Sequence, residues 1–87
     1  MITVEQLSAM AGERNYQGIA DAKAQLLVER MKLDKFFSMF LDKFERKMDP
    51  ENTNTPIWKL YKQKMKEYGE IERTIKSSNY YLTRPNV

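Results

Sequence analysis

The sequence predicts an all-α fold, an antiparallel hairpin of two long helices with a short N-terminal helix and an extended C-terminal tail, assembled into a dimeric bundle. Apolar residues recur at helical spacing through two long segments, and one turn-rich segment separates them. Glycine and proline are scarce, with three of each in 87 residues, which favours long uninterrupted elements. A chain of this length fits one domain, residues 1–87.

The first expected element is a short helix over residues 3–11. Thr3 is a favourable N-cap, and Gln6 stands three residues later, as a capping box requires. Gly12 follows the last residue of the helical pattern, and a polar connector comes after it. The sequence therefore predicts a helix that begins on a capping box and ends at a glycine.

The second expected element is a long helix over residues 17–48. No proline or glycine occurs between Ile19 and Met48, so nothing in this segment interrupts a helix. About 1.5 Å of rise per residue makes such a helix roughly 45 Å long. Its apolar stripe consists of Ile19, Ala22, Leu26, Leu33, Phe37, Phe40, Phe44 and Met48.

Residues 49–55 form the expected hairpin loop, because they contain a proline and several residues that favour turns and caps. Thr55 and Pro56 are a favoured N-cap and first-turn pair for a third helix over residues 56–77. The last segment, residues 78–87, shows no helical period and is expected to be an extended tail.

Folding the long helices back on each other gives a predicted register. Tyr61 is expected near Phe44, and Tyr68 near Phe37. The third helix is shorter than the second, so residues 19–27 need another cover. The first helix, the tail or a second subunit is expected to supply it.

The apolar arc of the second helix is wider than one partner helix usually covers. We therefore expect self-association as a homodimer, and we expect another protein as a further partner. Aromatic residues and methionine are enriched at such interfaces. The residues expected at a partner interface are Leu27, Met31, Phe36, Trp58, Tyr61, Met65, Tyr80 and Tyr81. The competing interpretation is that these side chains complete the core of the hairpin.

The composition argues against an enzyme. The chain has no histidine and no cysteine, so the commonest general base, the thiol nucleophile and the thiolate metal ligand are all missing. Residues 49–60 contain carboxylates and amides as a calcium loop does, but Asn54 and Leu60 stand where that loop needs glycine and glutamate. We therefore expect no catalytic residue, no metal site, no cofactor and no small-molecule substrate.

A net charge of +3 and basic residues on the outer faces of the two long helices favour a second function, a nucleic-acid-binding regulator. The residues expected to contact nucleic acid are Lys32, Lys35, Lys43, Arg46, Lys59, Lys62, Lys66, Arg73 and Lys76. The competing interpretation is that acidic residues interspersed among them make these faces ordinary solvated surfaces. No recognition helix or aromatic RNA-binding motif is apparent.

Two basic residues, Arg30 and Lys64, interrupt the apolar stripes. Each is expected either to extend its stem towards water or, in the case of Arg30, to pair with Glu72 across a subunit interface.

No signal peptide or apolar run of membrane-spanning length is seen, so we expect a cytoplasmic protein with no membrane partner. The leading functional hypothesis is a non-catalytic protein-interaction or assembly factor. Its size and composition also fit an accessory protein of a virus or another mobile element.

Overall fold

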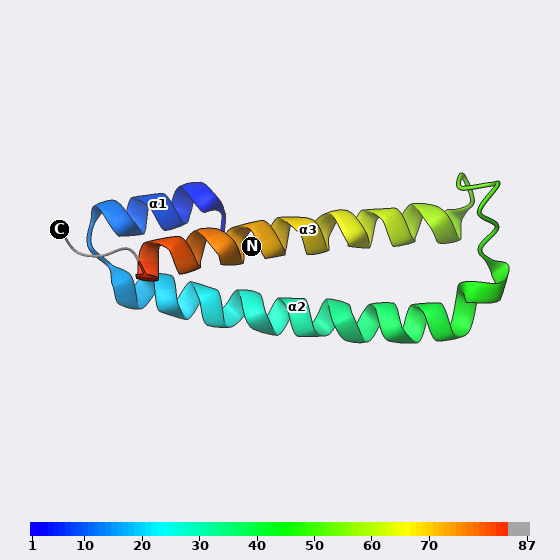
Figure 1. Cartoon of the computed structure of the whole chain (residues 1–87), viewed down its shortest axis with the longest axis horizontal. Helices are drawn as coiled ribbons and strands as arrows, with labels where there is room; N and C mark the ends of the chain where they lie inside the picture. The colour runs from blue at the N-terminus through cyan, green and yellow to red at the C-terminus, as the bar shows by residue number, and fades with distance from the viewer. Residues whose placement is uncertain (84–87) are drawn as a thin grey trace.

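The computed structural model describes residues 1–83. The elements are α1 (Val4–Gly12), α2 (Tyr16–Phe44), the 3-10 helix η1 (Glu45–Lys47) and α3 (Pro56–Thr83). No strand occurs within the described residues, and the predicted all-α class is confirmed. In Figure 1, α2 and α3 lie side by side and run in opposite directions, and α1 lies beside the end of this pair that is farthest from the connecting loop.

The predicted capping box starts α1. The Thr3 hydroxyl accepts a hydrogen bond from the Gln6 N–H at 3.2 Å, and the Gln6 side chain accepts one from the Thr3 N–H at 2.9 Å. Gly12 is still helical, and the chain instead leaves α1 through Arg14, whose φ of 60° is left-handed. This conformation costs arginine more free energy than glycine, so contacts with the rest of the chain must stabilise the turn after α1.

The second helix begins at Tyr16, where Asn15 is its N-cap and accepts a hydrogen bond from the Gly18 N–H at 3.0 Å. The prediction of one continuous helix to Met48 is wrong at its C-terminal end. The α-helix stops at Phe44, and the chain tightens into η1 before Met48 becomes extended. The α-helix thus ends in a 3-10 turn, as α-helices often do, and the restriction that Pro50 places on its preceding residue reaches only Asp49.

Three hydrogen bonds join the loop to the start of α3. The Thr55 hydroxyl accepts one from the Trp58 N–H at 3.3 Å, which confirms Thr55 as the cap. The Trp58 indole donates to the Asp49 carbonyl at 2.9 Å, and the Lys62 ammonium donates to the Thr53 carbonyl at 3.2 Å. These contacts fix the point at which α3 leaves the loop.

The third helix continues to Thr83, so the predicted extended tail is wrong for residues 78–83. The rest of that predicted tail, residues 84–87, lies outside the described residues. The hydroxyls of Ser78 and Thr83 donate to carbonyls three and four residues earlier, which a helix accommodates. Tertiary packing outweighs the weak helical pattern here, because Tyr81 and Leu82 pack against the core.

The buried residues form two clusters along the rod. Leu7, Ile19 and Ala22 make the first, against which Ile2, Met10, Ala11, Tyr81 and Leu82 pack. Leu26, Ile71 and Ile75 make the second, with Leu27 and Leu33 beside them. The segment of α2 that the third helix was expected to leave uncovered is therefore covered by α1 and by the last turns of α3.

Aromatic contacts give the register between α2 and α3. The rings of Phe37 and Tyr68 lie 6.0 Å apart between centroids, as predicted. Tyr61, however, stacks on Phe40 at 5.9 Å rather than lying against Phe44. Tyr61 thus lies about one helical turn closer to the start of α2 than predicted.

We predict that Leu7→Ala destabilises the fold by about 2–5 kcal/mol, because Leu7 is completely buried and its loss leaves a cavity between α1 and the long helices. Urea unfolding followed by circular dichroism measures this change. Ser8→Ala, on the exposed side of α1, is the matched control and should change stability by less than about 0.5 kcal/mol. Equal stability of the two variants would contradict the packing of α1.

Candidate interaction surfaces

The side of α2 that faces away from α3 carries large exposed apolar residues. Val28 is 50% exposed, Met31 is 68% exposed and Met39 is 70% exposed. At about 100° per residue, the three lie within an arc of about 80°, roughly opposite the buried Leu26 and Phe40. We call Val28, Met31 and Met39 the outer α2 patch.

Met1 adjoins this patch and is itself 70% exposed. It lines a shallow hollow together with Ile2, Ala24, Gln25, Leu26, Val28 and Glu29. It also lines one end of a groove between α2 and α3, with Glu29, Lys32, Leu33, Phe36, Lys64, Glu67 and Ile71. The N-terminal residue therefore extends the apolar surface across the middle of the molecule.

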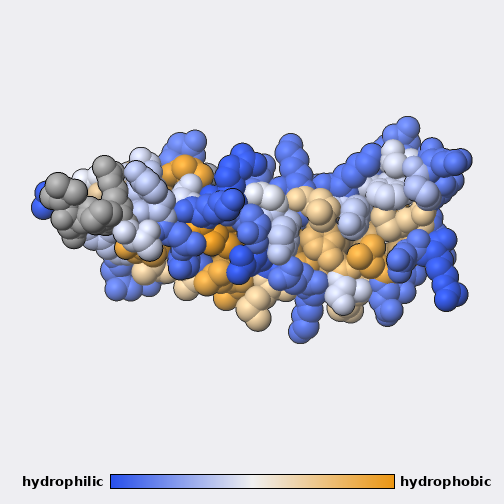
Figure 2. All heavy atoms as spheres, in the orientation of Figure 1, coloured by the Kyte–Doolittle hydropathy of each residue, from blue (hydrophilic) through white to orange (hydrophobic). Residues whose placement is uncertain are grey.

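Apolar residues are visible well beyond the seam between the helices. On the face drawn in Figure 2, they form a broken band along the rod, bordered by charged residues. Some reach the lower edge, which α2 forms in Figure 1. Internal packing of the chain thus leaves part of its apolar surface in contact with water.

The residues predicted at a partner interface divide into two groups. Met31, Met65 and Tyr80 are exposed, at 68%, 46% and 58%. The half-buried group consists of Leu27, Phe36, Trp58, Tyr61 and Tyr81. Members of the second group contact their own chain, which favours the core interpretation for them.

Aromatic stacking accounts for most of that half-buried group. The Phe36 ring stacks on Phe40 at 5.4 Å, and Trp58 meets Tyr61 edge to face at 5.7 Å. The Lys64 ammonium lies 5.6 Å from the centre of the Phe36 ring and 3.4 Å from the Glu67 carboxylate. Between the two helices, Tyr61 meets Phe37 at 5.7 Å and Phe40 at 5.9 Å, and these contacts hold the loop end of α2 against α3.

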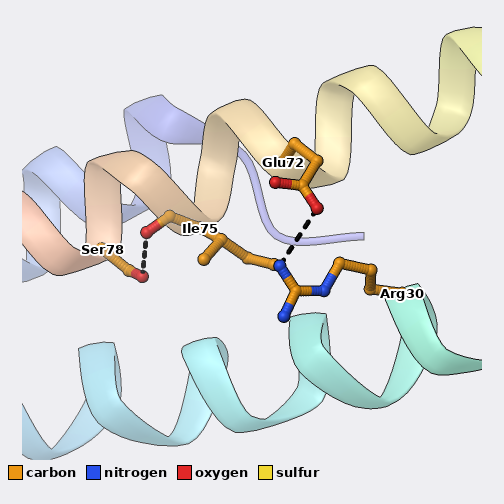
Figure 3. Close-up of polar contacts among 4 residues, drawn as sticks. All are labelled: Arg30, Glu72, Ile75 and Ser78. Atoms are coloured by element: carbon orange, nitrogen blue, oxygen red, sulfur yellow. Dashed lines mark hydrogen bonds and ion pairs between the residues drawn. The ribbon is translucent and has the colours of Figure 1, made fainter.

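The Arg30–Glu72 ion pair forms within one chain. Figure 3 shows the Arg30 guanidinium reaching from α2 to the Glu72 carboxylate on α3, at 3.0 Å. Both side chains keep at least a third of their surface exposed, so the pair contributes no more than about 1 kcal/mol. Arg30 is therefore engaged inside the protomer and is not needed for a subunit contact.

A second polar contact between α2 and α3 joins Asp34 to Tyr68. The Asp34 carboxylate accepts a hydrogen bond from the Tyr68 hydroxyl, and this bond is the main cause that raises the pKa of Tyr68 above 10.0. Desolvation and the negative charge of Asp34 raise that pKa further. The protonated phenol is the form that this site stabilises.

All nine basic residues predicted to contact nucleic acid are exposed, namely Lys32, Lys35, Lys43, Arg46, Lys59, Lys62, Lys66, Arg73 and Lys76. The charge is not spread evenly along the rod. Residues 36–66, the loop end, hold seven basic and four acidic residues, a net of +3. The rest of the chain, residues 1–35 and 67–87, holds eight basic and eight acidic residues, a net of zero.

Sequence reasoning missed two members of the outer α2 patch, Val28 and Met39. Their spacing held the signal, because both fall with Met31 on the face opposite the main stripe. The residues predicted at an interface on α2, such as Leu27 and Phe36, lie instead on the flanks of that stripe.

Within residues 1–83, no cluster of three or more His, Cys, Asp or Glu side chains is placed to hold a metal ion. No helix in this range has the length and apolar character needed to cross a membrane. Comparisons with protein-family models, with curated protein sequences and with solved structures found no match to the chain. Inference about function therefore rests on the surfaces of this molecule.

We predict that Asp34→Asn lowers the pKa of Tyr68 towards 10.0, because the carboxylate that favours the protonated phenol is removed. Phenolate absorbance during an alkaline titration measures the change, and Tyr68→Phe identifies the signal among the five tyrosines. The raised pKa implies stability that is fully present below pH 10 and lost as pH rises through the folded-state pKa. An unchanged titration in Asp34→Asn would refute this contact.

Proposed function

We propose that the protein is a non-catalytic interaction or assembly factor that associates with itself through the outer α2 patch. The supporting observation is that three large apolar side chains lie exposed on one side of one helix, away from the core. Large apolar side chains that gather on one exposed helix face often mark a site of association. Packing helix on helix would place that surface in a dimeric bundle.

The free energy available from the patch is sufficient for reversible association. Full burial of a Val or Met side chain stabilises a complex by about 1.5–3 kcal/mol, and a two-fold dimer buries each patch residue twice. Ordering and loss of translational freedom oppose this gain. The patch therefore supports reversible rather than permanent association.

A second protein partner would contact exposed apolar residues of α3. Leu60 and Met65 are 40% and 46% exposed, and they lie about 140° apart around this helix. Neither belongs to the outer α2 patch, so self-association through α2 is compatible with contact to another protein.

Nucleic-acid binding is the second candidate function. The loop end favours it, since its net charge of +3 is carried by exposed lysine and arginine side chains. Three of the basic residues already have partners, because Lys32 pairs with Glu29 at 3.4 Å, Lys62 bonds to Thr53, and Lys43 lies over Phe44. Those contacts favour the protein-interaction function.

We predict that the double variant Met31→Ser, Met39→Ser weakens self-association by at least about tenfold, because both side chains lose apolar burial at the interface. Light scattering after size-exclusion chromatography, over a range of loading concentrations, measures the dissociation constant. Met65→Ser is the matched control, since it removes an exposed methionine from α3. Equal dissociation constants for the two proteins would contradict the proposed interface.

The second candidate predicts salt-dependent affinity for DNA or RNA. If the protein contacts several phosphates, its affinity should fall roughly tenfold or more as the salt concentration rises from about 50 to 200 mM. Fluorescence anisotropy with labelled single-stranded and duplex oligonucleotides measures it. Lys59→Gln with Lys66→Gln should reduce any such affinity, and absence of binding at the lower salt concentration would eliminate this function.

A further inference from the structure

We infer that two copies of the chain pair antiparallel, α2 against α2, with the outer α2 patch at the centre and opposite ends of the rods side by side. This inference rests on the proposed self-association and specifies its geometry. It is argued from the shape of the molecule, the place of the patch along its length and the distribution of charge.

The dimensions of the rod decide between end-to-end and lateral pairing. The molecule measures 53 × 20 × 19 Å along its principal axes. An end of this rod offers at most about 400 Å², half of the roughly 800 Å² that each partner contributes to a standard interface. A long face offers on the order of 1,000 Å², which meets that requirement. Only lateral contact therefore supplies enough area.

The patch lies near the middle of the long face. Val28 and Met31 are close to the midpoint of α2, which spans Tyr16–Phe44, and Met39 lies about two turns further on. Met1 shares a hollow with Val28 and adds apolar surface beside it. A two-fold axis through this region buries the same apolar residues on both copies, as an isologous interface requires.

Charge decides between parallel and antiparallel pairing. A parallel pair would place the two loop ends together, +3 against +3. An antiparallel pair places each loop end beside the remainder of the other copy, whose net charge is zero. Like charges repel at short range, so the antiparallel arrangement is favoured at low and moderate ionic strength. The α2 dipoles also oppose each other in that arrangement.

Lys35 is a charged residue in the middle of the seam, since it stands four residues from both Met31 and Met39. Its side chain is exposed and takes part in no ion pair among the described contacts. A long aliphatic stem allows it to cover apolar surface while its ammonium group stays in water. Lys35→Met should therefore strengthen the dimer about tenfold, whereas Lys66→Met on the outside of α3 should leave it unchanged.

Disulfide trapping tests the orientation, because the chain has no cysteine of its own. Ala24 and Asp42 are exposed, lie on the same side of α2 as the patch and are equally distant from residue 33 near its centre. An antiparallel pair brings Ala24 of one copy beside Asp42 of the other. An equimolar mixture of Ala24→Cys and Asp42→Cys chains should therefore form mixed disulfide dimers under mild oxidation. Neither variant alone should crosslink.

The crosslinking result tests the orientation of the pair separately from self-association. Mixed disulfides from a dimeric protein support the antiparallel pair. Crosslinks of each variant with itself indicate a parallel pair, and a dimer that forms no crosslink indicates a different face, so both overturn the inference while leaving self-association intact. A strictly monomeric wild-type protein, or one that assembles only with nucleic acid, removes the proposed function as well. Lys66→Cys controls for random collision.

Discussion

The packing of α2 against α3 is the interaction on which the remaining structure depends. It buries the apolar stripes of both helices, from Leu26 with Ile71 and Ile75 to the aromatic rings at the loop end. Because two helices have only one shared seam, each also exposes an outer face. α1 covers part of one groove at one end, and within residues 1–83 no such cover lies over Val28, Met31 and Met39 on the outer face of α2.

Much of this fold could be predicted from local chemistry. The capping box at Thr3, the Thr55 cap and the contact between Phe37 and Tyr68 follow from residue types and helical spacing. The helix through residues 78–83 could not, because its support comes from Tyr81 and Leu82 meeting residues distant in sequence. The end of α2 could not be placed, because no glycine or proline lies between Gly18 and Pro50 to mark the change to a 3-10 turn at Glu45.

The candidate surface was harder to predict than the fold. Aromatic residues such as Trp58 and Tyr61 resemble interface anchors in sequence, yet the structure uses them to pack the loop end. Exposure depends on which face of a helix another element covers, and a single sequence does not contain that information. Met31 was predicted as a residue on the flank of the stripe, and Val28 and Met39 lie beside it on the outer face of α2.

Methionine oxidation at several protein concentrations tests most directly whether a second copy covers the outer face of α2. Exposed methionine oxidises readily to the sulfoxide, and mass spectrometry of peptides gives the rate for each residue. Burial of the patch in a dimer predicts that Met31 and Met39 become protected as concentration rises, while Met65 on α3 keeps a constant rate. Oxidation of Met31 and Met39 at the same rate at every concentration would contradict this arrangement.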